Sequence, residues 1–148
     1  MIILDTNVIS ELMKAAPDEQ VVAWLDQQEA MTLFTTSITV AEIIYGIDAL
    51  PAGKRRDYLE EAFNQVLSAA FKHRVLTFDE AAAHAWKSRK TSGNPLSVLD
   101  GQIAAITRTH QMRLATRNTR DFLGCELELI NPFRSRCAKY GRSLLRSE

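Results

Sequence analysis

Three acidic side chains stand at positions where a metal centre could form: Asp5, Glu42 and Asp100. Asp5 directly follows the apolar run Ile2-Ile3-Leu4, which predicts a buried parallel strand. Glu42 and Asp100 each lie near the expected start of a helix. In open α/β sheets ligands bind beyond the carboxyl ends of the strands, so we expect the three acids to gather at that edge.

Carboxylates that gather in this way raise one another's pKa, at a cost of roughly 1 kcal/mol or more for each pKa unit by which a group is raised. A bound cation would remove that cost. Oxygen ligands without His or Cys select hard divalent cations, and we therefore expect Mg²⁺, with Mn²⁺ as an alternative.

Each acid also has a purely structural interpretation as a helix cap. Asp5 would cap a helix that begins near Val8. The segment Thr39-Val40-Ala41-Glu42 fits a capping box, and Ser97-Val98-Leu99-Asp100 fits the same template with Asp in place of Glu. Taken singly, such acids are more often caps than ligands. The coincidence of three at one expected edge favours the metal site.

The polar segment Thr116-Arg117-Asn118-Thr119-Arg120-Asp121-Phe122 follows another expected strand and combines bases, an amide and one acid. The densest basic region near the expected site consists of Arg108, Arg113, Arg117 and Arg120. These bases form a candidate rim for phosphate. A polar loop, with Asn118 as turn former or cap, is an equally good interpretation.

Apolar periodicity predicts alternating strands and helices along the chain. We expect strands at residues 2–4, 32–36, 74–77, 113–116 and 127–130. We expect helices near residue 8, at 18–28, from 39, at 54–71, from 80 and from 97. Strands separated by helices predict an α/β fold, a single-domain three-layer α/β/α arrangement with a central, mostly parallel sheet.

The composition is that of an ordinary globular protein, with 148 residues, 46% hydrophobic residues and a formal net charge of zero. Nucleic-acid binding would therefore need a local basic patch. Cys125 and Cys137 are too far apart for a CxxC pair, and the three His residues lack metal-ligand spacing. With no signal peptide and no apolar run of about 20 residues, we expect a cytoplasmic protein without a membrane span.

The chain resembles PIN-domain ribonucleases of the VapC or FitB toxin type from Met1 to about Phe133. The residues that carry the resemblance are Leu4-Asp5-Thr6-Asn7, Ser37-Ile38-Thr39-Val40-Ala41-Glu42-Ile43, Ser97-Val98-Leu99-Asp100, Gln102-Ile103-Ala104-Ala105, Leu114-Ala115-Thr116-Arg117-Asn118 and Asn131-Pro132. The resemblance implies Mg²⁺-dependent RNA cleavage, a homodimer, and inhibition by a cognate antitoxin in a hetero-oligomer.

Carried over residue by residue, Asp5, Glu42 and Asp100 match the acidic triad of that family. The fourth acidic position stays open, because Asn118 stands where some relatives have Asp, and Asp121 lies close by. On this basis Asp5 and Asp100 would hold the cation directly, and Glu42 directly or through water. Asp121 is the fourth catalytic candidate.

Other polar residues would orient ligands or phosphate oxygens: Thr6, Asn7, Asn118 and Arg117. Water attack on a phosphodiester would leave 5′-phosphate and 3′-hydroxyl ends. Apolar surface on the early helices, around Trp24 and Ile44, is a candidate groove for the antitoxin.

Two other functions are compatible with an acid after an apolar strand. A haloacid-dehalogenase-like phosphatase would use Asp5 as nucleophile, but it needs a second acid two residues later, where Asn7 stands. A non-catalytic phospho-receiver or interaction module should carry its acceptor Asp after a central strand, whereas Asp5 follows the first strand of the chain.

We expect the nuclease domain to span residues 1–133. Residues 134–148 form a basic C-terminal extension, with five bases and one acid. An RNA-binding tail, a disordered segment and a cloning remnant all remain open for it.

Overall fold

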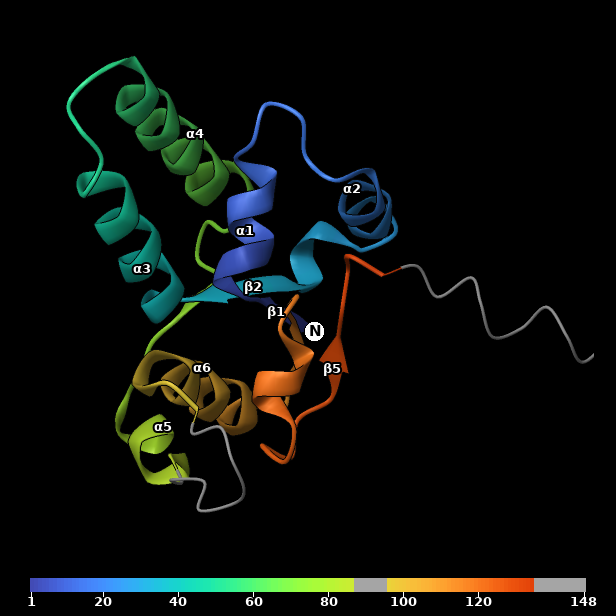
Figure 1. Ribbon diagram of the computed structural model, residues 1–148. Helices are drawn as coiled ribbons and strands as arrows, with labels where there is room; N and C mark the ends of the chain where they lie inside the picture. The colour runs from blue at the N-terminus through green and yellow to red at the C-terminus, as the bar shows by residue number, and fades with distance from the viewer. Residues whose placement is uncertain (87–95, 135–148) are drawn as a thin grey trace, which may run out of the picture.

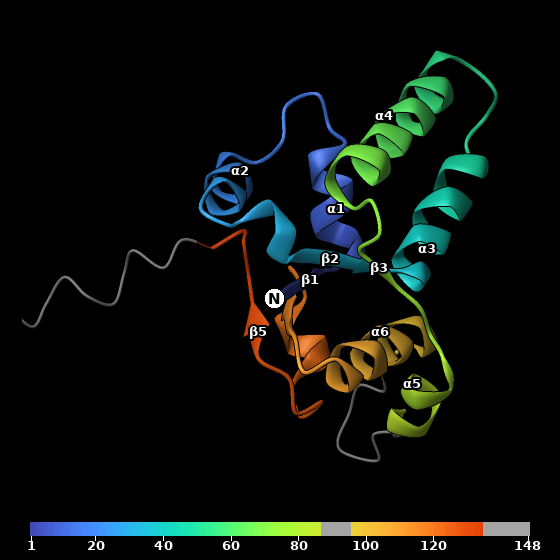
Figure 2. The same cartoon turned by 180° about the vertical axis from the view of Figure 1, so that it is seen from behind.

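A computed structural model describes residues 1–86 and 96–134, which form a parallel sheet between two layers of helices (Figures 1 and 2). The strands are β1 (Ile2–Leu4), β2 (Leu33–Thr36), β3 (Val75–Leu76), β4 (Arg113–Ala115) and β5 (Leu129–Ile130). The helices are α1 (Thr6–Leu12), α2 (Glu19–Asp26), α3 (Ser37–Asp48), α4 (Lys54–Ala70), α5 (Glu80–Ala85) and α6 (Val98–Thr109). Two 3₁₀ turns lie at Ala30–Thr32 and Thr119–Phe122. The predicted fold class is confirmed.

The strand order is β3-β2-β1-β4-β5, and every neighbouring pair is parallel. Ile3 of β1 is in register with Phe34 on one side and Leu114 on the other. The first strand of the chain is therefore the central strand of the sheet. The sequence argument against a receiver module was wrong on this point, because order along the chain does not give order in the sheet.

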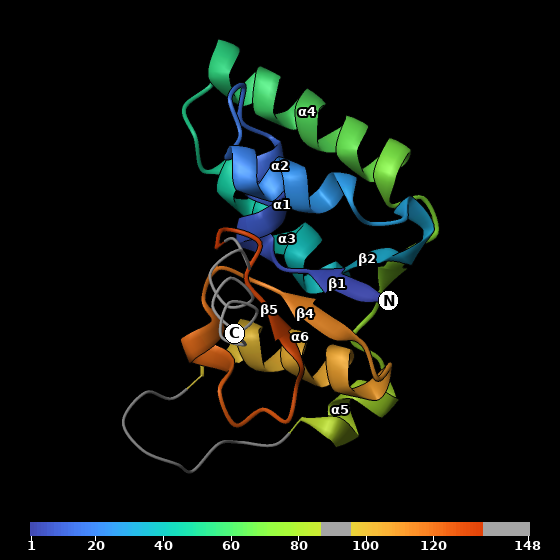
Figure 3. The same ribbon diagram turned by 90° about the vertical axis from the view of Figure 1, so that its right-hand side faces the viewer.

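Helices α1 to α4 cover one face of the sheet, and α5 and α6 cover the other (Figure 3). Ile2 and Leu4 pack with the first group of helices, whereas Ile3 packs with the second. Burial on both faces explains why β1 is uniformly apolar. Each such side chain contributes roughly 1.5–3 kcal/mol by leaving water, so the strand that carries Asp5 is firmly anchored.

Two helices begin at other residues than expected, and one expected cap is wrong. Helix α1 begins at Thr6, with Asp5 as its cap, rather than near Val8. Helix α3 is capped by Thr36, whose hydroxyl accepts from the Thr39 backbone N–H at 3.1 Å, so the predicted Thr39–Glu42 capping box is wrong. The cause is that β2 runs directly into α3 without a loop. Glu42 therefore lies in the second turn of the helix, where its side chain is available to the pocket.

Phe133 packs, partly buried, against the cluster that contains Ile2 and Leu4. Of the predicted basic extension only Arg134 is described, and residues 135–148 lie outside the described part of the chain. Within the described residues, no helix is long and apolar enough to span a membrane.

Candidate active site

The three predicted acids line one pocket of about 390 Å³ at the carboxyl edge of the sheet. Asp5 follows β1, Glu42 is in α3, which follows β2, and Asp100 is in the first turn of α6. Thr6, Asn7, Arg117 and Asn118, the predicted orienting residues, line the same pocket. The gathering expected from a parallel sheet is thus present in the structure.

Asp5 is almost fully buried, with 3% of its surface exposed, and both carboxylate oxygens accept hydrogen bonds. Oδ1 accepts from the Thr6 backbone N–H at 2.8 Å. Oδ2 accepts from the Thr116 hydroxyl at 2.8 Å and from the Asn7 amide at 3.3 Å. Burial raises the pKa of Asp5, and these donors, with Thr116 first, oppose the rise. Asp5 is therefore both a helix cap and a fixed member of the acidic group.

Glu42 and Asp100 complete the acidic group, but fewer hydrogen bonds oppose the rise in their pKa than in that of Asp5. Burial raises the pKa of Glu42, the charges of Asp5 and Asp100 raise it further, and Thr6 opposes the rise. Its Oε1 atom is buried and accepts no hydrogen bond from any described residue. Burial likewise raises the pKa of Asp100, Asp121 adds to this, and Ser97 opposes it.

The donor chemistry of this group fits a hard divalent cation. Carboxylates whose pKa is raised by burial and by neighbouring negative charges, and a buried Glu42 oxygen that accepts no hydrogen bond from a described residue, are features that a cation would satisfy. In residues 1–86 and 96–134, however, no three acidic, His or Cys side chains already converge closely enough to hold an ion.

Asp121 does not line the pocket, although it raises the pKa of Asp100, whereas Asn118 does line it. The Asn118 backbone N–H donates to the Thr116 hydroxyl at 3.1 Å, and its carbonyl accepts from Asp121 N–H at 3.0 Å. Of the two candidates for the fourth position, Asn118 is therefore the one that lines the pocket.

The expected phosphate rim of four arginines is wrong, because only Arg117 lines the pocket. Arg108 and Arg113 line a separate cavity, where Arg108 pairs with Glu126 at 3.4 Å, and Arg120 is exposed elsewhere. Arg108 lies near the end of α6 and Arg113 at the start of β4. Since a crossover helix runs back to the amino edge, these positions face away from the acids.

Three pocket residues were missed from the sequence: Ser10, Glu11 and Lys14. With Asn7 they follow the spacing i, i+3, i+4 and i+7, which places them on one face of α1 and the turn after it. This polar stripe starts two residues after Asp5 and is visible in the sequence. It would have pointed to the pocket.

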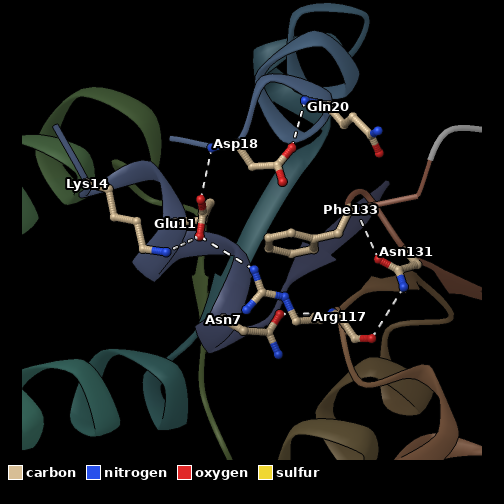
Figure 4. A network of polar contacts seen from close by, with 8 residues as sticks. All are labelled: Asn7, Glu11, Lys14, Asp18, Gln20, Arg117, Asn131 and Phe133. Carbon is tan, nitrogen blue, oxygen red and sulfur yellow. Dashed lines mark hydrogen bonds and ion pairs between the residues drawn. The ribbon is translucent and has the colours of Figure 1, made fainter. Parts of the chain in front are cut away.

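Glu11 joins the two bases of the pocket (Figure 4). Its carboxylate lies 2.7 Å from Lys14 Nζ and 3.6 Å from an Arg117 guanidinium nitrogen, and it accepts from Asp18 N–H at 2.9 Å. Only 7% of the Glu11 side chain is exposed. The hydrogen bond from Lys14, followed by the Asp18 N–H and the two positive charges, lowers the pKa of Glu11 despite desolvation.

Arg117 is tied to the rest of the site through its backbone and its side chain. Its N–H donates to Asn7 Oδ1 at 3.0 Å, and its carbonyl accepts from Asn131 at 3.3 Å. Asn131 also accepts from Phe133 N–H, and the Phe133 ring lies under the guanidinium, 3.8 Å from ring centroid to carbon (Figure 4). The Asn131-Pro132-Phe133 step therefore fixes Arg117 against the pocket.

The antitoxin groove expected around Trp24 and Ile44 is not one feature. Ile44 lines a cavity of about 160 Å³ between α3 and α4, whereas Trp24 packs against the core from α2. The two residues belong to different surfaces.

A known protein family shares the part of the chain that forms this pocket. The family model described as "PIN domain" matches residues 2–123, which include the whole acidic pocket. The chain belongs to the PIN domain family. This PIN chain is 44% identical to VapC ribonuclease Y4jK of Sinorhizobium fredii over 137 residues, covering 90% of this chain and 98% of the relative. It is 39% identical to Toxin FitB of Neisseria gonorrhoeae over 137 residues, covering 90% and 99%.

The PIN fold also agrees with solved structures. The structure of FitAB bound to an IR36 DNA fragment matches with a TM-score of 0.83 at 39% identity, over 91% of this chain and 97% of that one. The crystal structure of FitAcB from Neisseria gonorrhoeae matches with a TM-score of 0.82 at 38% identity, over 91% and 100%.

Proposed function

We propose that this PIN chain is a metal-dependent endoribonuclease and the toxin of a type II toxin-antitoxin pair, acting in the cytoplasm. One observation carries the proposal: a pocket lined by three carboxylates with raised pKa values, in which Glu42 Oε1 accepts no hydrogen bond from any described residue. Its relatives named VapC ribonuclease and Toxin FitB support the choice of RNA as substrate and of toxin as role.

Asp5, Glu42 and Asp100 would hold the cation, Mg²⁺ or Mn²⁺. When bound, the cation supplies an activated water and offsets the negative charge that develops on phosphorus. The Thr116 hydroxyl and the Asn7 amide fix the Asp5 carboxylate from behind, so that it does not need to reorganise. Thr6 and Asn118, on the pocket wall, would orient water or phosphate oxygens.

Incubation of the purified protein with an RNA pool tests the proposal. We expect cleavage with Mg²⁺ or Mn²⁺, none after exhaustive chelation, and products with 5′-phosphate and 3′-hydroxyl ends. Ligation to an adaptor that requires a 5′-phosphate reads out those ends. Full cleavage by a chelated sample would show the mechanism to be wrong.

The fourth position can be tested by metal titration of two variants. We expect Asn118→Asp to tighten metal binding, because it adds a charged oxygen on the pocket wall. Asp121→Asn should weaken it only slightly, since Asp121 acts on Asp100 from outside the wall. Unchanged affinity in both variants would leave Asp5, Glu42 and Asp100 as the whole acidic site.

We also propose a cognate antitoxin as partner and a homodimer as the basic unit. The solved FitAB and FitAcB structures, both of which match more than nine-tenths of the chain, support the antitoxin partner. The homodimer is what the resemblance to VapC and FitB toxins implies. Co-purification with the protein encoded beside it, followed by size-exclusion chromatography with light scattering, is the direct test. A monomer that captures no neighbour-encoded protein would contradict it.

A further inference from the structure

The pocket has a basic part that the acidic group does not explain. Lys14 and Arg117 line it beside Glu11, and both pair with Glu11. Asp100 raises the pKa of Asp5, Asp5 and Asp100 raise that of Glu42, and Asp121 raises that of Asp100. Lys14 and Arg117 act instead on Glu11, whose pKa they lower. The pocket therefore combines an acidic group with a separate cluster of two bases around one acid.

The basic cluster carries an unmatched positive charge. Glu11 is the one ion-pair partner of Lys14 and Arg117 in the part of the chain that the structure describes. One carboxylate cannot neutralise two cations. Lys14 and Arg117 are also 59% and 50% exposed, so the cluster is open to an anion that enters the pocket.

The guanidinium of Arg117 is held in place but keeps donors that could bind a ligand. Phe133 covers one face of the guanidinium at 3.8 Å, which leaves the N–H groups in its plane uncovered by the ring. Glu11 is 3.6 Å away, beyond hydrogen-bond distance, and the guanidinium donates no hydrogen bond to any residue in the ranges 1–86 and 96–134. A planar fork with available donors matches two oxygens of a phosphate.

We propose that Lys14 and Arg117 bind an RNA phosphate adjacent to the one that is cleaved, and that Glu11 and Phe133 hold the two cations in place for it. This inference rests on the proposed ribonuclease function. Glu11 fixes the spacing of the two cations before RNA arrives, and the Asn131 contact keeps Phe133 under Arg117. Lys14 and Arg117 are binding residues, whereas Glu11 and Phe133 are positioning residues.

Binding of a fluorescent single-stranded RNA to the chelated protein, measured by anisotropy over a range of salt, tests this without cleavage. Lys14→Gln and Arg117→Gln should each flatten the slope of log affinity against log salt by about 0.7, the value for one phosphate contact on a single strand. Arg117→Lys should retain the wild-type slope, because it keeps the charge. Lys54→Gln, at the start of α4 and outside the pocket, is the matched control and should bind like the wild type.

Cleavage kinetics with metal add a second readout. A contact to a phosphate away from the reacting bond stabilises the bound ground state and the transition state equally. Both Gln variants should therefore raise KM about 5- to 10-fold and leave kcat within about 2-fold. If Arg117→Gln also lowers the thermal midpoint, Lys14→Gln, whose side chain is mostly exposed, carries the test alone.

The two proposals fail in different ways. If the wild type cleaves RNA but Lys14→Gln and Arg117→Gln bind it with the wild-type slope, the phosphate site is wrong and the ribonuclease function stands. If the wild type neither binds nor cleaves RNA, both are wrong. A fall in kcat without a rise in KM would also overturn the phosphate site.

Discussion

Substitution of Asp100 can show whether an acid at the carboxyl edge of the sheet binds a metal or only caps a helix. Burial and the charge of Asp121 raise its pKa, so its ionised form destabilises the metal-free fold at neutral pH. The cap of α6 comes instead from the Ser97 hydroxyl, which accepts from the Asp100 backbone N–H at 3.1 Å and would survive substitution. We expect Asp100→Asn to lower cleavage at least about 100-fold while the thermal midpoint without metal stays equal or rises.

A matched control is Asp57→Asn, the same change in the first turn of α4, where the carboxylate is exposed and outside the pocket. There the helix dipole favours the charge, so the midpoint should fall slightly with cleavage unchanged. Retained cleavage or a lowered midpoint in Asp100→Asn, measured by RNA gel and thermal melt, would contradict the metal role.

The ionised form of Glu11, unlike that of Asp100, should stabilise the fold, so Glu11 should make the stability depend on pH. Its pKa in the folded protein lies below the ordinary value of 4.5, so its ionised form stabilises the fold above that pH. The stabilisation is lost as the pH falls through the lowered pKa. We expect Glu11→Gln to cost about 1–2 kcal/mol at pH 7 and to approach wild-type stability well below pH 4.5. Urea denaturation at a series of pH values measures this, and an offset that is independent of pH would contradict it.

At this scale the sequence predicted the three acids and Arg117 as pocket residues, but not Glu11 and Lys14. Asp5, Glu42 and Asp100 were found because each was expected to follow a strand or to open a helix at the carboxyl edge, although Glu42 lies in the second turn of α3. Glu11 and Lys14 look like an ordinary surface pair three residues apart, which contributes little as a rule. Their importance depends on Arg117, more than a hundred residues away, and no local pattern reveals that contact.

The junction between β2 and α3 positions Glu42. Thr36, the last residue of β2, caps α3 at this junction. Thr36 is fully buried, and its hydroxyl accepts from Thr39 N–H and donates to the Thr39 hydroxyl at 3.3 Å. We expect Thr36→Ala to cost about 1–2 kcal/mol, and to lower cleavage because α3 loses its fixed start. Thr36→Ser keeps the hydroxyl and should retain most of the activity. Chemical denaturation and cleavage assays on both variants check this, and equal losses would point to packing of the Thr36 methyl group instead.

Element positions followed from apolar periodicity, and their order in space did not. Each expected strand is present, although β3 and β5 are only two residues long. The position of β1 at the centre depends on pairing with β2 and β4, which are far apart in sequence. The cap of α3 was misplaced because two threonines three residues apart both suit a helix start, and only the end of β2 decides between them.

For the molecule as a whole, a bound cation should raise stability by mass action. At 100 times its dissociation constant, a ligand that binds only the folded state contributes about 2.7 kcal/mol. For a chain of this size that is on the order of 5–10 °C in thermal midpoint. We expect Mg²⁺ or Mn²⁺ to give such a gain in the wild type and a smaller one in Asp5→Asn, which keeps an oxygen for the Thr6 N–H. Equal gains in both proteins, measured by thermal melt with and without metal, would place the ion elsewhere.

The central place of β1 also determines when a ribosome can deliver a working pocket. Asp5 precedes both β4, the strand beside it, and the hydroxyl of Thr116 by more than a hundred residues. Until these are synthesised, one edge of β1 has no partner, and Asp5 lacks the hydroxyl that donates to its Oδ2 atom. Arg117 and Asn118 follow at once, and Phe133 only after β5. The pocket is therefore incomplete until more than a hundred residues beyond Asp5 have been synthesised.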